Sequence, residues 1–202
     1  MPRVSSKDKY IVQVFELFKS KGLMLNMEQI ALEIGLTKKT LYNNFVSKNE
    51  LIQTVLNYFY SEMDKKIQIQ AAQSCNAIEA FINVSVIISE EMAKLGTLLL
   101  RDISIYQSSP DIFTYSDRIN FYSKLVNTNL DRGIGEDLYR KNINKDYSAL
   151  FYTSAIESFY RWEGSFKHFN RMSEYHKELV VHHLYSVVND NGAKVLGAYL
   201  NK

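Results

Sequence analysis

The residues between positions 37 and 48 are of types that can contact double-stranded DNA. In the major groove, lysine reaches the O6 and N7 atoms of guanine, and asparagine pairs with the N6 and N7 atoms of adenine. Lys39 and either Asn43 or Asn44 are therefore the best candidates for base contacts. Hydroxyl and lysine side chains, and the start of a helix, suit phosphate oxygens. The complete set of candidate DNA-binding residues is Asn26, Thr37, Lys38, Lys39, Thr40, Tyr42, Asn43, Asn44 and Lys48.

These candidates also have purely structural explanations. The phosphate candidates are Asn26, Thr37, Tyr42 and Lys48. Asn26 and Thr37 are also residue types that cap the start of a helix. Tyr42 fits a half-buried surface aromatic residue, and the lysine pair at 38–39 fits a solvated helix face. For any one of these residues taken alone, the structural explanation is the better one. Taken together, they form one string in register, with glycines at the expected helix ends, and this pattern favours binding to DNA.

Short helices must hold these side chains in place. Asn26 and Thr37 predict the starts of two such helices. Gly22 predicts the end of the helix that precedes them, and Gly35 permits a sharp turn between the two. The apolar residues recur at the spacing of one helix face. The predicted helices are Ser5–Lys21, Met27–Ile34 and Lys38 to about Phe45, which together form a helix-turn-helix unit.

The rest of the chain keeps a helical rhythm. Ser47 and Glu50 form an S-x-x-E capping box, which predicts a long fourth helix that runs to the Ser74–Asn76 region. We therefore predict an all-α fold. The further predicted helices are Ala77–Leu95, Thr97–Gln107, Ser108 to Arg132 with a break at Gly133-Ile-Gly135, Asn144 to Phe169, and Ser173 to Asn189 or beyond.

The run from Ile30 to Leu51 resembles the DNA-binding signature of the TetR family of bacterial transcriptional repressors, roughly I-A-x-x-A-G-V-S-x-x-T-L-Y-x-Y/H-F-x-S-K-E-x-L. The resemblance is specific over residues 8–55, about a quarter of the chain. The family often has glycine at the position of Lys39 and an aromatic residue or histidine at that of Asn44, so a family-average operator is not expected. The matching positions are Ile30, Ala31, Gly35, Thr37 (for serine), Thr40, Leu41, Tyr42, Phe45, Ser47, Lys48 and Leu51.

The resemblance implies a three-helix helix-turn-helix head, joined by a long fourth helix to a carboxy-terminal helical bundle with a dimerisation helix pair. The implied domains are 1–48 for DNA binding, 49–75 for the connecting helix, and 76–202 for ligand binding and dimerisation. A small-molecule pocket is implied among the middle helices, with Arg101-Asp102 either a charge pair beside it or an exposed salt bridge. The candidate pocket residues, which also fit an ordinary aromatic core, are Tyr106, Phe113, Tyr122, Phe151 and Trp162.

Two stripes of aromatic and aliphatic residues near the carboxy terminus suggest a dimer. Their apolar surface is larger than so small a chain can bury by itself. Pairing with a second copy into a four-helix bundle would bury this surface. A two-fold dimer then implies a palindromic operator with half-sites about one helical turn, or a multiple of it, apart. The candidate dimerisation residues are Phe159, Phe166, Val180, Leu184 and Val187.

Composition and charge exclude several classes of protein. Of the 202 residues, 46% are apolar and 23% are charged, as in globular rather than disordered proteins. The single cysteine, Cys75, excludes an internal disulfide and suits a reducing cytoplasm. Without an apolar signal-peptide core or a membrane-length apolar segment, we expect a cytoplasmic protein with no membrane contact. The first 48 residues carry a net charge of +4, which suits a polyanionic partner.

Motifs for catalysis and metal binding are not found in the sequence. The four histidines do not form an HxxxH or HxxE cluster with enough ligands on one face. Cys75 has no recognisable catalytic partner, and no G-x-S-x-G, P-loop or dinucleotide motif occurs. We therefore expect no enzyme activity, no cofactor and no bound metal.

These observations lead us to expect a homodimeric transcriptional repressor whose partners are double-stranded DNA, a second copy of the chain and an unknown small-molecule effector that releases it from a palindromic operator. A first alternative is a TetR-like DNA-binding protein that acts through a protein partner without an effector. A well-packed carboxy-terminal domain with no cavity would favour this alternative. A second is a helical enzyme or carrier with a vestigial head. Failure to bind any duplex, together with turnover of a bound compound, would favour that alternative.

Overall fold

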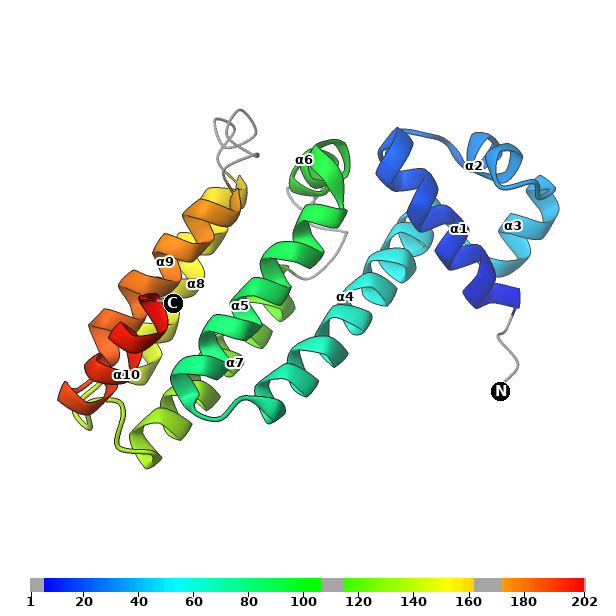
Figure 1. Cartoon of the computed structure of the whole chain (residues 1–202). Helices are drawn as coiled ribbons and strands as arrows, with labels where there is room; N and C mark the ends of the chain where they lie inside the picture. The colour runs from blue at the N-terminus through cyan, green and yellow to red at the C-terminus, as the bar shows by residue number, and fades with distance from the viewer. Residues whose placement is uncertain (1–5, 107–114, 162–171, 202) are drawn as a thin grey trace. The chain divides into compact units, whose positions relative to one another are not determined.

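The computed structural model describes residues 6–106, 115–161 and 172–201 (Figure 1). These residues form helices without any strand, and the chain is all-α, as its sequence predicts. None of the described helices is long and apolar enough to cross a membrane. The helices are α1 (Ser6–Lys21), α2 (Met27–Glu33), α3 (Lys38–Asn44), α4 (Lys48–Gln73), α5 (Ala77–Lys94), α6 (Gly96–Tyr106), α7 (Tyr115–Gly135), α8 (Lys145–Arg161), α9 (Met172–Val187) and α10 (Asp190–Leu200).

The chain divides into two compact units. The first unit comprises Met1–Asp64 with Ala93–Phe113, and the second comprises Lys65–Met92 with Thr114–Lys202. Helix α4 passes from the first unit into the second, and α6 belongs with the amino-terminal helices. The functional division at 1–48, 49–75 and 76–202 stays a prediction.

The first unit is built around the amino-terminal helices (Figure 1). Phe18 of α1, Ile30 of α2 and Leu41 of α3 have no exposed surface, so the three helices share one apolar core. Gly22 and Gly35 both have φ near +70°, the left-handed conformation that glycine adopts at little cost. These two turns are therefore formed by the residues that the sequence pattern assigns to them.

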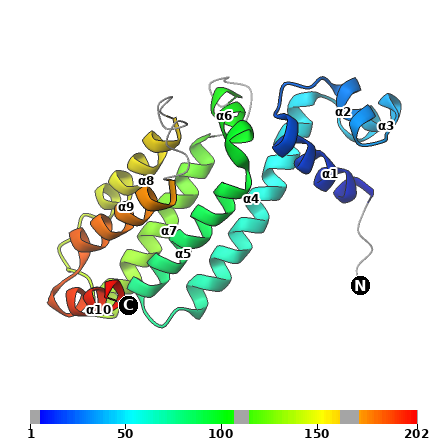
Figure 2. The same cartoon turned by 45° about the horizontal axis from the view of Figure 1, so that its top comes forward.

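The second unit contains α5, α7, α8, α9, α10 and the end of α4. Helices α8 and α9 lie side by side, and α7 packs against α8 (Figures 1 and 2). Their apolar faces meet in one core. The buried residues of this core are Ala77, Ile78, Phe81, Val126, Leu130, Tyr139, Ala149, Tyr152, Val180, Leu184, Val187, Val188 and Leu196.

Two helix ends differ from the sequence prediction. Helix α7 continues through Gly133 and ends at Gly135, because Gly133 makes room for the buried ring of Tyr139 rather than breaking the helix. Helix α9 ends at Val187, and Asn189 caps a separate α10 by accepting a hydrogen bond from the Gly192 N–H at 2.9 Å. The helix start predicted at Ser108–Asp111 lies outside the described residues.

Candidate DNA-binding head and ligand pocket

The starts of α2 and α3 are capped by the side chains that the sequence pattern assigns to them. Asn26 accepts a hydrogen bond from the Gln29 N–H at 2.9 Å, and its own N–H donates to the Gln29 side chain at 2.8 Å. Thr37 accepts from the Thr40 N–H at 3.1 Å. These bonds satisfy N–H groups that have no partner within the helix and so fix where each helix begins. Asn26 and Thr37 are both exposed, so their capping role leaves them accessible.

One face of α3 is open to solvent. Leu41 is fully buried and holds the helix to the core, whereas Tyr42 keeps 41% of its surface exposed. Lys39 and Asn43 are exposed, and neither forms a hydrogen bond or ion pair with any residue that the structure describes. Their donors and acceptors are therefore available to an external partner.

The other polar residues of α3 are already engaged. The Asn44 amide donates to the Thr40 carbonyl oxygen at 2.8 Å, and the Thr40 hydroxyl pairs with that of Thr37 at 2.8 Å. Lys38 forms an ion pair with Glu28, which lowers the pKa of Glu28 and raises that of Lys38. Of the two asparagines proposed for base contacts, the geometry thus favours Asn43 over Asn44.

Lys48 points toward α6. Its Nζ lies 5.8 Å from the centre of the Tyr106 ring, and both side chains are half-buried. Burial lowers the pKa of Lys48 and raises that of Tyr106. Tyr106, a candidate pocket residue by sequence, therefore lies in the first unit beside a candidate phosphate contact.

Helix α6 is joined to the α1–α2 turn by a buried carboxylate. Asp102, only 3% exposed, accepts a hydrogen bond from the Leu23 N–H at 2.8 Å and is paired with Arg101 at 2.8 Å. A Cβ at Gly22 would lie 2.3 Å from the Asp102 carboxylate, so glycine is needed for this approach as well as for the turn. The Arg101-Asp102 pair thus joins an exposed arginine, with 51% of its side chain exposed, to a buried carboxylate, and neither residue lines the pocket described below. The bond to Leu23 spans 79 residues and has no local sequence signal.

Asp102→Ala is expected to lower the free energy of unfolding by about 2 kcal/mol, because it leaves the buried Leu23 N–H without an acceptor. Asp102→Asn keeps an acceptor oxygen and should cost less. Urea denaturation measures both changes, and amide hydrogen exchange at Leu23 should accelerate in the alanine variant. A loss below about 0.5 kcal/mol for Asp102→Ala, a typical surface-substitution value, would contradict this role.

The second unit contains a cavity of about 200 Å³. Of the candidate pocket residues, Tyr122 lines it, whereas Phe151 is 73% exposed on the surface of α8. Phe113 and Trp162 lie outside the described residues. Helical spacing identifies aromatic residues but does not tell which face of a helix turns inward, so most of the lining was missed. The lining residues are Ala71, Ala80, Phe81, Val84, Ser85, Ile88, Tyr122, Leu125, Val126, Thr128, Asn129, Arg132, Tyr152 and Ile156.

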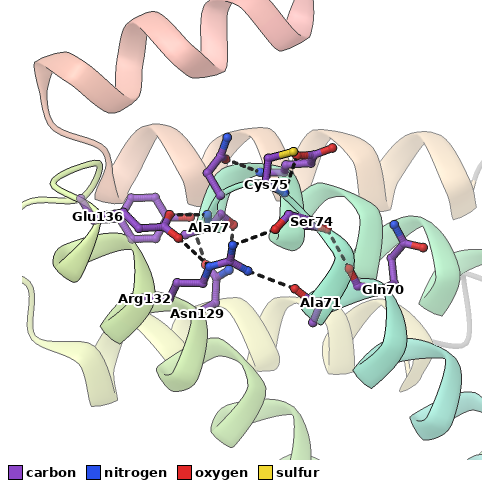
Figure 3. Close-up of polar contacts among 11 residues, drawn as sticks. Gln70, Ala71, Ser74, Cys75, Ala77, Asn129, Arg132 and Glu136 are labelled. Atoms are coloured by element: carbon purple, nitrogen blue, oxygen red, sulfur yellow. Dashed lines mark hydrogen bonds and ion pairs between the residues drawn. The ribbon is translucent and has the colours of Figure 1, made fainter.

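A set of polar contacts beside this cavity ties the end of α4 to α7 (Figure 3). The Arg132 guanidinium donates to the carbonyl oxygens of Ala71 at 3.0 Å and Ser74 at 2.8 Å, and to the Glu136 carboxylate at 2.6 Å. Glu136 in turn accepts from the Ala77 N–H at 2.7 Å. Carbonyls at the end of α4 and an N–H at the start of α5 are therefore satisfied by one i, i+4 pair on α7. We call these contacts the Arg132 clamp.

The proposed dimerisation residues on α9 require correction. Val180, Leu184 and Val187 are at most 3% exposed and belong to the core of the second unit. A side chain without exposed surface has nothing to offer a second copy, so these three stabilise the single chain. The side chain of Phe159 and the whole of Phe166 lie outside what the structure describes.

The sequence and the fold both resemble known regulators. Residues 14–55 match the model of the family described as "Bacterial regulatory proteins, tetR family". The chain is 26% identical over 166 residues to the uncharacterized HTH-type transcriptional regulator YvaF of Bacillus subtilis, covering 79% of this chain and 84% of that protein.

Solved structures with the same fold include a TetR-family transcriptional regulator from Streptomyces coelicolor, with a TM-score of 0.72, 14% identity and coverage of 90% of this chain and 95% of that chain. Another is SmeT, the repressor of the Stenotrophomonas maltophilia multidrug efflux pump SmeDEF, with a TM-score of 0.69, 12% identity and coverage of 93% of both chains. At these identities the structures establish a shared fold. Residues 14–55 therefore match the TetR family of bacterial regulators, and the relative by sequence and the solved structures with the same fold are transcriptional regulators.

Proposed function

We propose that this protein is a homodimeric repressor that binds a palindromic operator and is released by a small molecule bound in the second unit. The observation that carries the proposal is the open face of α3, where Lys39 and Asn43 are exposed and unpaired among the described residues. In this arrangement α3 enters the major groove, and these two side chains contact base edges. The likeness in fold to SmeT, which is described as a repressor, supports repression as the sign of regulation.

The phosphate contacts then come from the periphery of α3. Tyr42 and the exposed caps Asn26 and Thr37 can reach phosphate oxygens beside the groove. Lys38 forms an ion pair with Glu28, which offsets its charge. It should therefore contribute less to the affinity for DNA than an unpaired lysine would. Such contacts position the head without reading sequence.

An exposed apolar stripe on α8 is the dimer surface that we propose in place of the buried α9 residues. Tyr147, Leu150 and Phe151 follow helical i, i+3, i+4 spacing and are 60%, 49% and 73% exposed. Aromatic and aliphatic side chains so exposed are suited to burial against a second copy. TetR-family regulators typically bind DNA as dimers, which supports self-association here.

Release by an effector would work through the Arg132 clamp. Ala71 and Arg132 belong both to the cavity wall and to the contacts that hold the end of α4. A ligand that fits only when these contacts shift prefers a different placement of α4, the helix that continues into the first unit. The cavity also favours an effector over the alternative in which the protein acts only through a protein partner.

The operator and the dimer can be tested together. The purified full chain is used to select from a pool of random duplexes, and the enriched sequences are determined. We expect an inverted repeat with half-sites about one helical turn, or a multiple of it, apart. Enrichment of a single half-site would contradict the dimer, and enrichment of no sequence would contradict the regulator function.

Lys39→Ala is expected to change base preference at one position of each half-site, because a lysine contact to guanine contributes about 1–3 kcal/mol of discrimination. The measurement repeats the duplex selection with the variant. Lys177→Ala on α9 removes the same charge from an exposed site in the second unit and serves as the matched control. If Lys39→Ala keeps the base preference of the unaltered chain, Lys39 makes no base contact.

A further inference from the structure

The cavity of the second unit has a predominantly apolar wall. Phe81, Ile88 and Val126 contribute large apolar surfaces from α5 and α7, and Ile156 adds one from α8. The Phe81 and Tyr152 rings meet edge to face at 5.0 Å, which keeps this part of the wall in place. A wall of this kind favours an apolar occupant.

The Asn129 and Ser85 side chains in the wall are bonded to the protein itself. The Asn129 amide donates to the Ala77 carbonyl oxygen at 2.8 Å, and its oxygen accepts from the Tyr139 hydroxyl at 3.0 Å. The Ser85 hydroxyl donates to the Ile82 carbonyl oxygen at 2.7 Å. A ligand that hydrogen-bonded to these groups would first have to break bonds that already satisfy them.

The charge in the wall is compensated in the same way. Arg132 is the one charged residue among the described lining residues, and its guanidinium donates to Glu136, Ala71 and Ser74. The Glu136 carboxylate lies 2.6 Å from the Arg132 Nε and neutralises it. A carboxylate or ammonium group that entered the cavity would therefore lose its hydration without gaining an opposite charge.

The hydroxyl of Tyr152, a wall residue, contacts a buried imidazole rather than a charged group. It lies 3.1 Å from the His176 Nε2, and His176 is only 5% exposed. Burial lowers the pKa of His176 to about 4, so the imidazole is neutral near pH 7. Among the residues that the structure describes, this side of the cavity also lacks a group that would compensate an ionic ligand.

We propose that the effector cavity selects an uncharged, mainly apolar molecule of about the size of a substituted benzene ring. The size follows because an apolar protein cavity of roughly 150 Å³ accepts benzene, and this cavity is about 200 Å³. The inference rests on the proposed function only in calling the ligand an effector. The charge selection follows from the wall itself.

A charge series of similar ligands tests the selection. Methyl benzoate, benzoate and benzylammonium are titrated into the full chain at pH 7.5 by isothermal calorimetry. The Kd of methyl benzoate should be at least tenfold below that of either ion, with a negative heat-capacity change from apolar burial. Equal or tighter binding of either ion, or no binding of methyl benzoate, would overturn the proposal.

Two variants on α5 show whether binding takes place in this cavity. Val84 lines the cavity, and Val84→Phe fills part of it. Val86 is 48% exposed on the same helix and does not line the cavity, so Val86→Phe makes the same chemical change outside it. Val84→Phe should weaken methyl benzoate at least tenfold and Val86→Phe should leave it unchanged, with circular dichroism confirming that both fold. Equal effects would place the ligand elsewhere and overturn the proposal.

A third variant tests the physical cause of the selection. Glu136→Gln removes the counter-charge of Arg132, so benzoate should gain at least threefold in affinity relative to methyl benzoate. An unchanged ratio would contradict the neutralising role of Glu136. Duplex binding is measured on the same samples. A chain that selects neutral ligands but binds no duplex would refute the proposed function alone, and one that binds its operator but prefers ions would refute this inference alone.

Discussion

Gly133→Ala is expected to lower the free energy of unfolding by about 3 kcal/mol, because the added methyl group overlaps a buried aromatic ring. A Cβ at this position would lie 2.1 Å from one carbon of the Tyr139 ring and 2.3 Å from another. Tyr139 is 1% exposed, and its N–H also bonds to the Gly133 carbonyl oxygen at 3.0 Å. The Tyr139 ring therefore has little room to move away from the new methyl group. The overlap would strain the turn after α7.

Gly135, two residues further along the same helix, provides a matched control. A Cβ at Gly135 would have no neighbour within 4 Å, and its φ is not positive. Gly135→Ala should therefore be neutral or stabilise by roughly 0.5 kcal/mol through the unfolded chain. Urea denaturation of the two variants should give changes of opposite sign or widely different size. Equal values for both would show that Tyr139 does not restrict residue 133.

The head is predictable from sequence because its signals are local. Asn26 and Thr37 cap helices whose first turns begin one residue later, and Gly22 and Gly35 supply the left-handed turns. Each of these features depends on residues within about four positions. The helix-turn-helix unit and its family could therefore be inferred from a quarter of the chain.

The second unit is less predictable because its decisive contacts are distant in sequence. Arg132 bonds to carbonyl oxygens 58 and 61 residues away, and no pattern around Arg132 indicates them. The stripe at Val180, Leu184 and Val187 has the spacing of a buried face, but spacing does not distinguish a core within the chain from a surface buried by a second copy. The dimer prediction failed at these residues for that reason.

Acidification from pH 6.5 to pH 4 is expected to remove about 3 kcal/mol of folding stability for each of His176 and His183. The two side chains are 5% and 7% exposed, and burial lowers the pKa of each to about 4. The unfolded chain binds their protons near pH 6.5, so stability is fully present above that pH, falls as the pH drops, and levels off below pH 4 for these groups. The combined loss from the two histidines is comparable with the whole free energy of unfolding of many domains.

The surroundings of the imidazoles explain why protonation is costly. The His183 ring stacks on Phe81 at 4.7 Å and lies 4.9 Å from the Tyr152 ring, and its Nε2 is buried without a hydrogen-bond partner in the described structure. His176 contacts the Tyr152 hydroxyl through Nε2, while its Nδ1 is also unpartnered there. Burial lowers the pKa of both imidazoles, and no carboxylate of the described residues is paired with either ring.

His183→Leu isolates this contribution from the carboxylates that titrate in the same range. The free energy of unfolding is measured in urea between pH 7.5 and pH 4.5 at fixed chain concentration, and the slope against pH should be shallower in the variant than in the original chain. His182→Leu replaces an exposed histidine on the same helix and should keep the original slope. Identical slopes for all three proteins, or an imidazole resonance of His183 that titrates near pH 6.5 in the folded chain, would mean that the buried ring accepts a proton as readily as one in water.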